Sequence, residues 1–268
     1  MGYACSETSE FMPLGQLLAQ KLAMQLALMR KKKIVNYLRP DAKCQLTLEY
    51  KDAAAPRLEN VVVSVQHDRV VSVLKIKNDI IQKAIKPICH QFLDKDTKIF
   101  VNHAGKFVIG GPAADTGATG RKIIIDSYGS TVPSGGSGFS GKDPTKIDRS
   151  GAYMARYIAK NIVAANLAGE CFVRLAYIIG DIKPIEVSIE TFGTASIDEE
   201  LIERAVPKVF DLSPGGIIRQ LKLLRPIYRK TSNYGHFGRQ EPEFTWEKTD
   251  KTKDLLREIT KLSKTKNN

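Results

Sequence analysis

The chain has 268 residues, of which 43% are hydrophobic, so it is long enough to build one large domain or two ordinary ones. Lys and Arg number 41 against 29 Asp and Glu, and the net charge of +12 favours anionic partners. Four separated cysteines without a C-x-x-C pair argue against a zinc or redox motif. No apolar run reaches the roughly 18 residues of a membrane span, and no signal-peptide pattern opens the chain, which predicts a cytoplasmic protein with reduced thiols.

The first hundred residues predict an α+β domain with helices on one face of a sheet. Residues 1–11 predict an irregular lead, and Pro13 opens a helix with Leu14, Leu18, Leu22, Leu26 and Met29 near one face. Residues 38–43 resemble a turn and 52–60 a loop. Alternating or β-branched residues then predict strands over 44–50, 61–65 and 98–102, and a helix over 78–92 that Pro87 interrupts.

The remaining residues predict a second α+β unit, so we expect domains at 1–103 and 104–268. Short strands are predicted over 108–109 and 122–126, and longer ones over 171–179 and 185–190. Helices are predicted over 151–166, capped by Ser150, over 198–206, capped by Asp198, and over 215–224. Residues 130–141 predict a mobile loop, and the polar end at 261–268 predicts a frayed tail.

The stretch 105–149 concentrates glycines, basic residues and carboxylates. Glycines let the backbone approach a ligand closely, and exposed amides with basic side chains suit a polyphosphate. Carboxylates among them suit the hard cation that accompanies phosphate. The stretch therefore predicts a phosphate site.

Two familiar phosphate motifs do not fit this stretch. Residues 117–123 (GATGRKI) lack the spacing and the final hydroxyl of a P-loop. Gly136, Gly138 and Gly141 form G-x-G-x-x-G, but they follow a loop where a dinucleotide fold needs a strand. Nucleic-acid binding ranks far lower, because no aromatic residues alternate with the basic ones.

The wording of this stretch carries a family resemblance. GKFVIGGP (105–112), TGRKIIIDSYG (119–129) and FSGKDPTKIDRS (139–150) resemble the carboxy-terminal signature of S-adenosylmethionine synthetases. The resemblance continues through LRPDAK (38–43), YGHFGR (234–239) and WEKTDK (246–251), and so covers nearly the whole chain.

The resemblance implies three similar α+β domains around a pseudo-threefold axis, of which this chain would supply the central and carboxy-terminal ones. It implies a methionine adenosyltransferase, which converts ATP, L-methionine and water to S-adenosylmethionine, phosphate and diphosphate with Mg²⁺ and K⁺. It also implies a homodimer or a dimer of dimers with active sites between subunits. Neither nucleic acid nor a membrane is an expected partner.

The resemblance also assigns roles to individual residues. It implies catalytic roles in triphosphate binding for Arg121, Lys122 and Lys142, and methionine contacts for Asp115 and Lys146. It places Asp148 near magnesium, although this carboxylate could equally pair with Arg149. The full set that it implies for ATP is Asp41, Ala42, Lys43, Lys106, Phe107, Asp115, Arg121, Lys122, Gly138 and Lys142.

Some of these roles have a plainer alternative. Asp41 and Lys43 could form a surface ion pair, Phe107 could be a core residue and Asp115 could make an Asx-turn. Lys106 stands where the family usually has arginine and lacks its planar fork. His236 resembles a catalytic histidine, but a lone histidine is more often packed and hydrogen-bonded, so it is left out of the site.

Family members normally carry about another third of sequence ahead of these domains, with the main magnesium and potassium ligands. Two interpretations follow. The chain is a truncated or split synthetase that is inactive or very weak alone and complemented by an amino-terminal chain, or it is a non-catalytic homologue that serves as an interaction or regulatory subunit of a complete synthetase.

Overall fold

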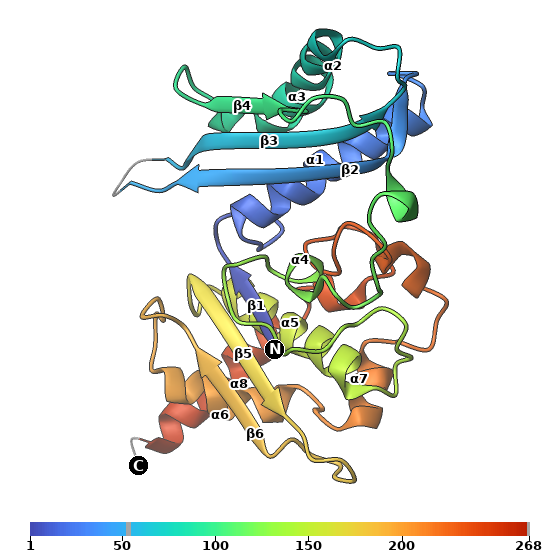
Figure 1. Cartoon of the computed structure of the whole chain (residues 1–268). Helices are drawn as coiled ribbons and strands as arrows, with labels where there is room; N and C mark the ends of the chain where they lie inside the picture. Colours follow the sequence, from blue (N-terminus) through green and yellow to red (C-terminus); the bar gives the residue numbers. More distant parts are fainter. Residues whose placement is uncertain (52–54, 267–268) are drawn as a thin grey trace. The chain divides into compact units, whose positions relative to one another are not determined.

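The structure is a computed structural model that describes residues 1–51 and 55–266 (Figure 1). The chain forms two compact units. The central unit is Leu14–Ala118, and the C-terminal unit combines Met1–Pro13 with Thr119–Asn268. Each unit has a three-stranded sheet and helices, which confirms the predicted α+β class.

The sheet of the central unit has the order β2-β3-β4. Strand β2 (Leu38–Glu49) is antiparallel to β3 (Arg57–His67), and β4 (Lys98–Val101) is parallel to β3. The strands are longer than predicted. Residues 38–43, expected as a turn, begin β2, and the register shifts between Leu38 and Ala42. Of the expected loop at 52–60, residues 57–60 belong to β3, and 52–54 lie outside the described residues.

Helices cover one face of this sheet (Figure 1). The predicted helix after Pro13 is α1 (Leu14–Lys31), and its expected apolar face lies in the core. The second predicted helix is a series of short segments: α2 (Val73–Ile80), a π-helical turn (Ile81–Ile85), α3 (Lys86–Cys89) and a 3-10 turn (His90–Phe92). Pro87 lies in the first turn of α3, where its missing N–H costs nothing.

The sheet of the C-terminal unit has the order β1-β5-β6, and all its pairs are antiparallel. Strands β5 (Glu170–Ala176) and β6 (Glu186–Glu190) match predicted strands. The prediction of an irregular lead was wrong, because Gly2–Cys5 forms β1. A Cβ atom on Gly2 would lie 2.1 Å from the backbone of Ala155, so only glycine allows this close packing.

In its described residues the unit also has the α-helices α4 (Ile123–Asp126), α5 (Ile147–Ala164), α6 (Glu199–Val209), α7 (Pro214–Gln220) and α8 (Thr252–Lys266), and the 3-10 turns η4 (Tyr228–Thr231) and η5 (Thr245–Glu247). Asp198 caps α6 as predicted. Three other predictions were wrong. Residues 123–126 form a helical turn, α5 begins before Ser150, and the expected frayed tail is helical as far as Lys266; residues 267–268 lie outside the described range.

The expected strand at 108–109 is absent as well, since both residues lie outside any strand of the described chain. Residues 104–122 instead form a long connection with one 3-10 turn, η3 (Gly111–Ala113). Within residues 1–51 and 55–266 no helix has the length and apolarity needed to cross a bilayer.

Candidate functional site

The central unit contains a cavity of about 730 Å³. Five of the residues that the sequence assigned to ATP line it, namely Asp41, Lys43, Lys106, Phe107 and Asp115. Ala42 does not line it, although it stands between two residues that do. The other lining residues are Ser64, Asn102, Ala104, Gly105, Gly111, Pro112, Ala114 and Gly117. The cavity therefore lies where strands β2 and β3 meet the glycine-rich connection.

Asp41 fixes this connection to strand β2. Its Oδ2 atom accepts a hydrogen bond of 2.8 Å from the backbone N–H of Gly111. Gly111 has φ +64°, a left-handed conformation that favours glycine. A Cβ atom on the preceding Gly110 would lie 2.7 Å from the side chain of Gln66. The carboxylate thus shapes the wall of the cavity, in addition to any contact with a ligand.

Phe107 is held by a reciprocal pair of hydrogen bonds with His67. Its N–H donates to His67 Nε2, and the N–H of His67 donates to the carbonyl of Phe107, both at 3.0 Å. The ring nitrogen Nδ1 of His67 lies 2.9 Å from the carbonyl of Asp68. Since a carbonyl only accepts, the proton is assigned to Nδ1 and Nε2 is the acceptor. The buried imidazole therefore orients the backbone that carries the expected adenine contact.

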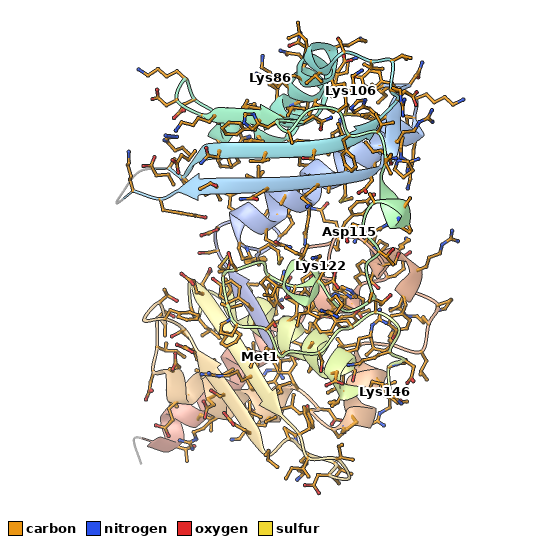
Figure 2. The ribbon with its side chains drawn as sticks, in the orientation of Figure 1. Met1, Lys86, Lys106, Asp115, Lys122 and Lys146 are labelled. Carbon is orange, nitrogen blue, oxygen red and sulfur yellow. The ribbon has the colours of Figure 1, made fainter. Side chains whose placement is uncertain are left out.

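Lys106 and Asp115 are exposed on the central unit (Figure 2). The ammonium of Lys106 donates to the carbonyl of Arg69 at 3.0 Å. The N–H of Asp115 donates to the carbonyl of Gly111, also at 3.0 Å, directly after the turn η3. Both residues thus line the cavity from an exposed position.

Asn102 was missed by the sequence analysis. It is buried with φ +46°, and its amide pairs with both backbone groups of Val65, accepting at 2.8 Å and donating at 3.0 Å. It turns the chain from β4 into the connection 104–118 that lines the cavity. A signal was present, because asparagine is the residue other than glycine that most readily adopts this conformation after a strand.

The C-terminal unit carries the other predicted residues. Arg121 and Lys122 are exposed just before α4, and within the described residues neither forms an ion pair. The ammonium of Lys142 lies 2.8 Å from Asp148 Oδ2, and that of Lys146 lies 3.5 Å from Asp143 Oδ2. Figure 2 shows Lys122 and Lys146 among the side chains of this unit.

Gly138 lies against another glycine. A Cβ atom at Gly138 would lie 2.8 Å from the Cα atom of Gly120. Two backbone segments therefore approach each other more closely than side chains permit, one leading to Arg121 and one leading to Lys142. This contact brings the two loops with the predicted phosphate-binding residues together.

Asp148 pairs with Lys142, and the alternative of a pair with Arg149 was wrong. The hydrogen bond from Lys142, opposed by partial burial and aided by Ser137, lowers the pKa of Asp148. Among residues 1–51 and 55–266 no group of three or more His, Cys, Asp or Glu side chains is arranged to hold a metal ion. The assignment of Asp148 to magnesium stays a prediction.

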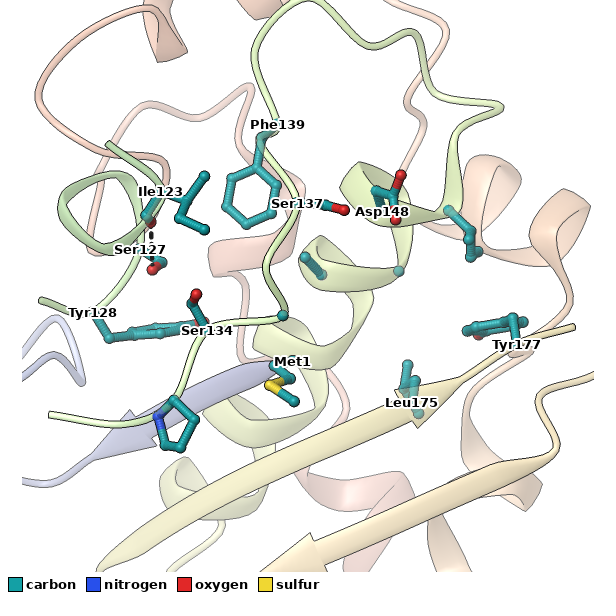
Figure 3. Close-up of a pocket in the computed structure, with 15 residues that line it drawn as sticks. Met1, Ile123, Ser127, Tyr128, Ser134, Ser137, Phe139, Asp148, Leu175 and Tyr177 are labelled. Atoms are coloured by element: carbon teal, nitrogen blue, oxygen red, sulfur yellow. Dashed lines mark hydrogen bonds between the residues drawn. The ribbon is translucent and has the colours of Figure 1, made fainter. Parts of the chain in front are cut away.

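A second cavity of about 260 Å³ lies beside Asp148 in the same unit (Figure 3). Figure 3 shows Ser137 and Asp148 on one side and Met1, Leu175 and Tyr177 on another. Its wall near α4 is fixed by the hydroxyl of Ser127, which donates to the carbonyl of Ile123 at 2.8 Å. The mixture of hydroxyls, one carboxylate and apolar side chains suits a small amphipathic ligand.

Two α+β units with a glycine-rich, basic connection define a chain of repeated sheet domains with candidate phosphate sites. Sequence similarity to known protein families identifies the family of this chain. Residues 1–107 match the central domain of S-adenosylmethionine synthetase, and residues 109–248 match its C-terminal domain. The chain belongs to the S-adenosylmethionine synthetase family, which confirms the resemblance seen in the motifs.

The S-adenosylmethionine synthase of Pseudothermotoga lettingae is 52% identical over 258 residues. The match covers 96% of this chain and 65% of that relative. The first 13 residues match the central-domain family by sequence but lie in the C-terminal unit by compactness. The domain boundary expected after residue 103 stays a prediction.

Proposed function

We propose that this chain is part of a methionine adenosyltransferase that forms S-adenosylmethionine, phosphate and diphosphate from ATP, L-methionine and water. Family membership supports the proposal. The observation that carries it is the gathering of Asp41, Lys43, Lys106, Phe107 and Asp115 around one cavity. The chain spans only 65% of the length of its relative, so we propose the activity of the whole protein and do not infer it from the relative alone.

In the reaction, the methionine sulfur attacks C5′ of ATP, the C5′–O bond breaks, and the triphosphate leaves with the bonding electrons. Water then cleaves the triphosphate. No covalent enzyme intermediate is needed, so the protein contributes alignment and charge stabilisation. Arg121, Lys122 and Lys142 would stabilise the leaving triphosphate, since hydrogen bonds to charged groups are among the strongest.

The cavity of the central unit would take the nucleoside end of ATP. Phe107 would stack on adenine, while Lys43 and Lys106 would contact the nucleotide from the exposed rim. The carboxylate of Asp115 would accept a hydrogen bond from the ammonium of methionine, and Lys146 would contact the same substrate. Gly138 would leave room for ATP beside the close backbone contact with Gly120.

Mg²⁺, when bound, would neutralise charge on the phosphates, and K⁺ is the second ion that the proposal includes. Asp148 is the one predicted ligand in this chain, and Lys142 already pairs with it. The other ligands would have to come from a complementary amino-terminal chain or a partner subunit. The proposed assembly is accordingly a homodimer, a dimer of dimers, or a complex with a complementary chain.

The test measures methionine-dependent triphosphate release by this chain alone and after addition of an amino-terminal domain from a synthetase. We expect little activity alone and rescue on addition. ATP binding without turnover in both cases would favour a non-catalytic subunit. In the same assay, alanine at Arg121, Lys122 and Lys142 should weaken binding of ATP. Unchanged affinity would contradict the assigned phosphate site.

A further inference from the structure

Arg149 lies beneath the loop that carries Lys142. It is 3% exposed, and its guanidinium makes three hydrogen bonds. Nη1 donates to the carbonyl of Lys142 at 2.8 Å, Nε to the hydroxyl of Tyr153 at 3.0 Å, and Nη2 to Thr231 Oγ1 at 2.9 Å. The guanidinium also lies over the ring of Tyr228 at 4.2 Å. This residue thus holds the backbone of Lys142 from inside the unit.

Tyr153 continues the network to a buried histidine. Because arginine has only donors, the Tyr153 oxygen accepts from Arg149 and keeps its own hydrogen for another acceptor. Within the described residues that acceptor is His236 Nδ1, at 2.7 Å. The imidazole is 0% exposed, and burial together with Arg149 and Arg239 lowers its pKa to about 3. It is therefore neutral, and its one proton lies on Nε2.

The protonated nitrogen of His236 faces the same loop. Nε2 lies 3.4 Å from Ser140 Oγ, two residues before Lys142. The ring of Phe139 packs edge-on against the imidazole, with centroids 5.0 Å apart. The loop closes on itself, since the N–H of Lys142 donates to the carbonyl of Phe139 at 3.2 Å. Arg149 and His236 thus bind the two ends of a four-residue turn.

We propose that Arg149, Tyr153 and His236 are positioning residues that fix the turn Phe139–Lys142 through one directed chain of hydrogen bonds. The backbone of Lys142 is then fixed from below and its ammonium is fixed by Asp148, so the cation is held in place before an anionic ligand arrives. Pre-ordered donors lose less entropy on binding a polyphosphate. The inference rests on the proposed function for the identity of that ligand, but the fixed turn itself can be measured without it.

The main test is Tyr153→Phe, which removes the central hydroxyl and keeps the ring. The ring of Tyr153 stacks on Trp246 with centroids 4.0 Å apart, so packing is retained. Tyr157→Phe is a matched control. It removes a hydroxyl from the same helix, but this hydroxyl donates to Asp250 and lies away from the turn. We expect faster hydrogen exchange of residues 139–146 and roughly tenfold weaker binding of inorganic tripolyphosphate in the first variant only, the weight of one charge-assisted contact.

Nitrogen-15 spectra of the histidine ring give an independent readout. In the wild type, His236 should show a single tautomer with the proton on Nε2, and in Tyr153→Phe it should show a mixture. Ser140→Ala, at a partly exposed position, guards against a folding defect and should give a smaller increase in exchange over the same residues.

Wild-type exchange in Tyr153→Phe, or an equal increase in Tyr157→Phe, would overturn the positioning role. A wild-type chain without measurable affinity for tripolyphosphate would contradict the proposed function instead. In that case, the exchange and tautomer measurements would still decide whether the network fixes the turn.

Discussion

The guanidinium of Arg156 and the carboxylate of Glu247 form an ion pair of 2.9 Å in the interior of the C-terminal unit, where their side chains are 0% and 6% exposed. Glu247 also accepts from Lys160 at 2.7 Å and from the N–H of Gly238 at 2.9 Å. The guanidinium further donates to the carbonyls of Tyr3, Glu10 and Phe11. The pair thus holds the first residues of the chain to helix α5.

Glu247→Gln should destabilise the C-terminal unit strongly, because it leaves the Arg156 charge buried without its counter-ion. We expect a loss of about 3–5 kcal/mol in the free energy of unfolding. Urea unfolding followed by the fluorescence of Trp246, the one tryptophan, measures it. Glu190→Gln breaks the half-exposed pair with Arg174 and should cost less than about 1 kcal/mol. Equal losses in both variants would show that the buried ion pair contributes no more to the free energy of unfolding than the exposed one.

This pair explains why the start of the chain was mispredicted. Residues 1–11 have no alternation that marks a strand, and β1 forms because β5 and Arg156 supply partners that lie more than 140 residues away. Helix α1 was predicted well, since its apolar spacing is a local signal. Residues 122–126 were predicted as a strand, yet residues 123–126 form a helical turn in which Ile124 and Ile125 are at least half exposed.

The stability of the C-terminal unit should depend on pH through His236, its only histidine. The pKa of this buried imidazole is lowered from its usual 6.5 to about 3. Between these values the unfolded state binds a proton that the folded state does not, so stability falls as pH decreases below about 6.5. The slope should approach about 1.4 kcal/mol per pH unit.

Urea unfolding between pH 7.5 and 5 measures this slope. His236→Gln lacks the titrating group and should lose most of the pH dependence over that range, even if the variant is less stable overall. A wild-type curve that is flat between pH 6.5 and 5 would mean that the imidazole gains a proton in the folded state as easily as in the unfolded one.

Asn102 should stabilise the central unit through both its hydrogen bonds and its tolerance of a left-handed backbone. Asn102→Ala leaves both backbone groups of Val65 without their side-chain partners and keeps a left-handed backbone, so we expect a loss of about 2–4 kcal/mol. Asn102→Gly relieves the backbone and loses only the hydrogen bonds. Thermal unfolding of the two variants separates these contributions, and alanine no worse than glycine would remove backbone conformation from the account.

The predicted site residues were found through long sequence motifs. Such motifs do not distinguish residues that line a cavity from residues that fix its wall, and the structure does. Asp41 and Phe107 line a cavity and also fix its wall, since one binds Gly111 and the other pairs with His67. Arg149 and Tyr153 were missed because Thr231 and His236, their partners across the unit, lie more than 80 residues away in sequence. Asn102 has a residue type that favours its left-handed backbone, but its partner Val65 lies 37 residues away. His236 was judged a packed histidine from sequence; its buried bond to Tyr153 adds a specific link that no local pattern contains.

Lys43 and Lys106 should contribute to ATP affinity through their charge. Both line the cavity of the central unit and both are exposed, so their replacement should leave the fold intact. The double variant Lys43→Ala and Lys106→Ala should bind ATP about 10- to 100-fold more weakly at low salt, since each contact between a cation and a phosphate contributes on the order of 1 kcal/mol. Isothermal titration at 50 and 300 mM salt should show a smaller salt dependence than in the wild type, because fewer charges remain to be screened.

Lys95→Ala combined with Lys98→Ala removes the same charge from the same unit at two other exposed lysines, and it should change the affinity less than about twofold. If both double variants weakened ATP binding equally, ATP affinity would depend on the net charge of the unit, and the assignment of the nucleotide to this cavity would be wrong.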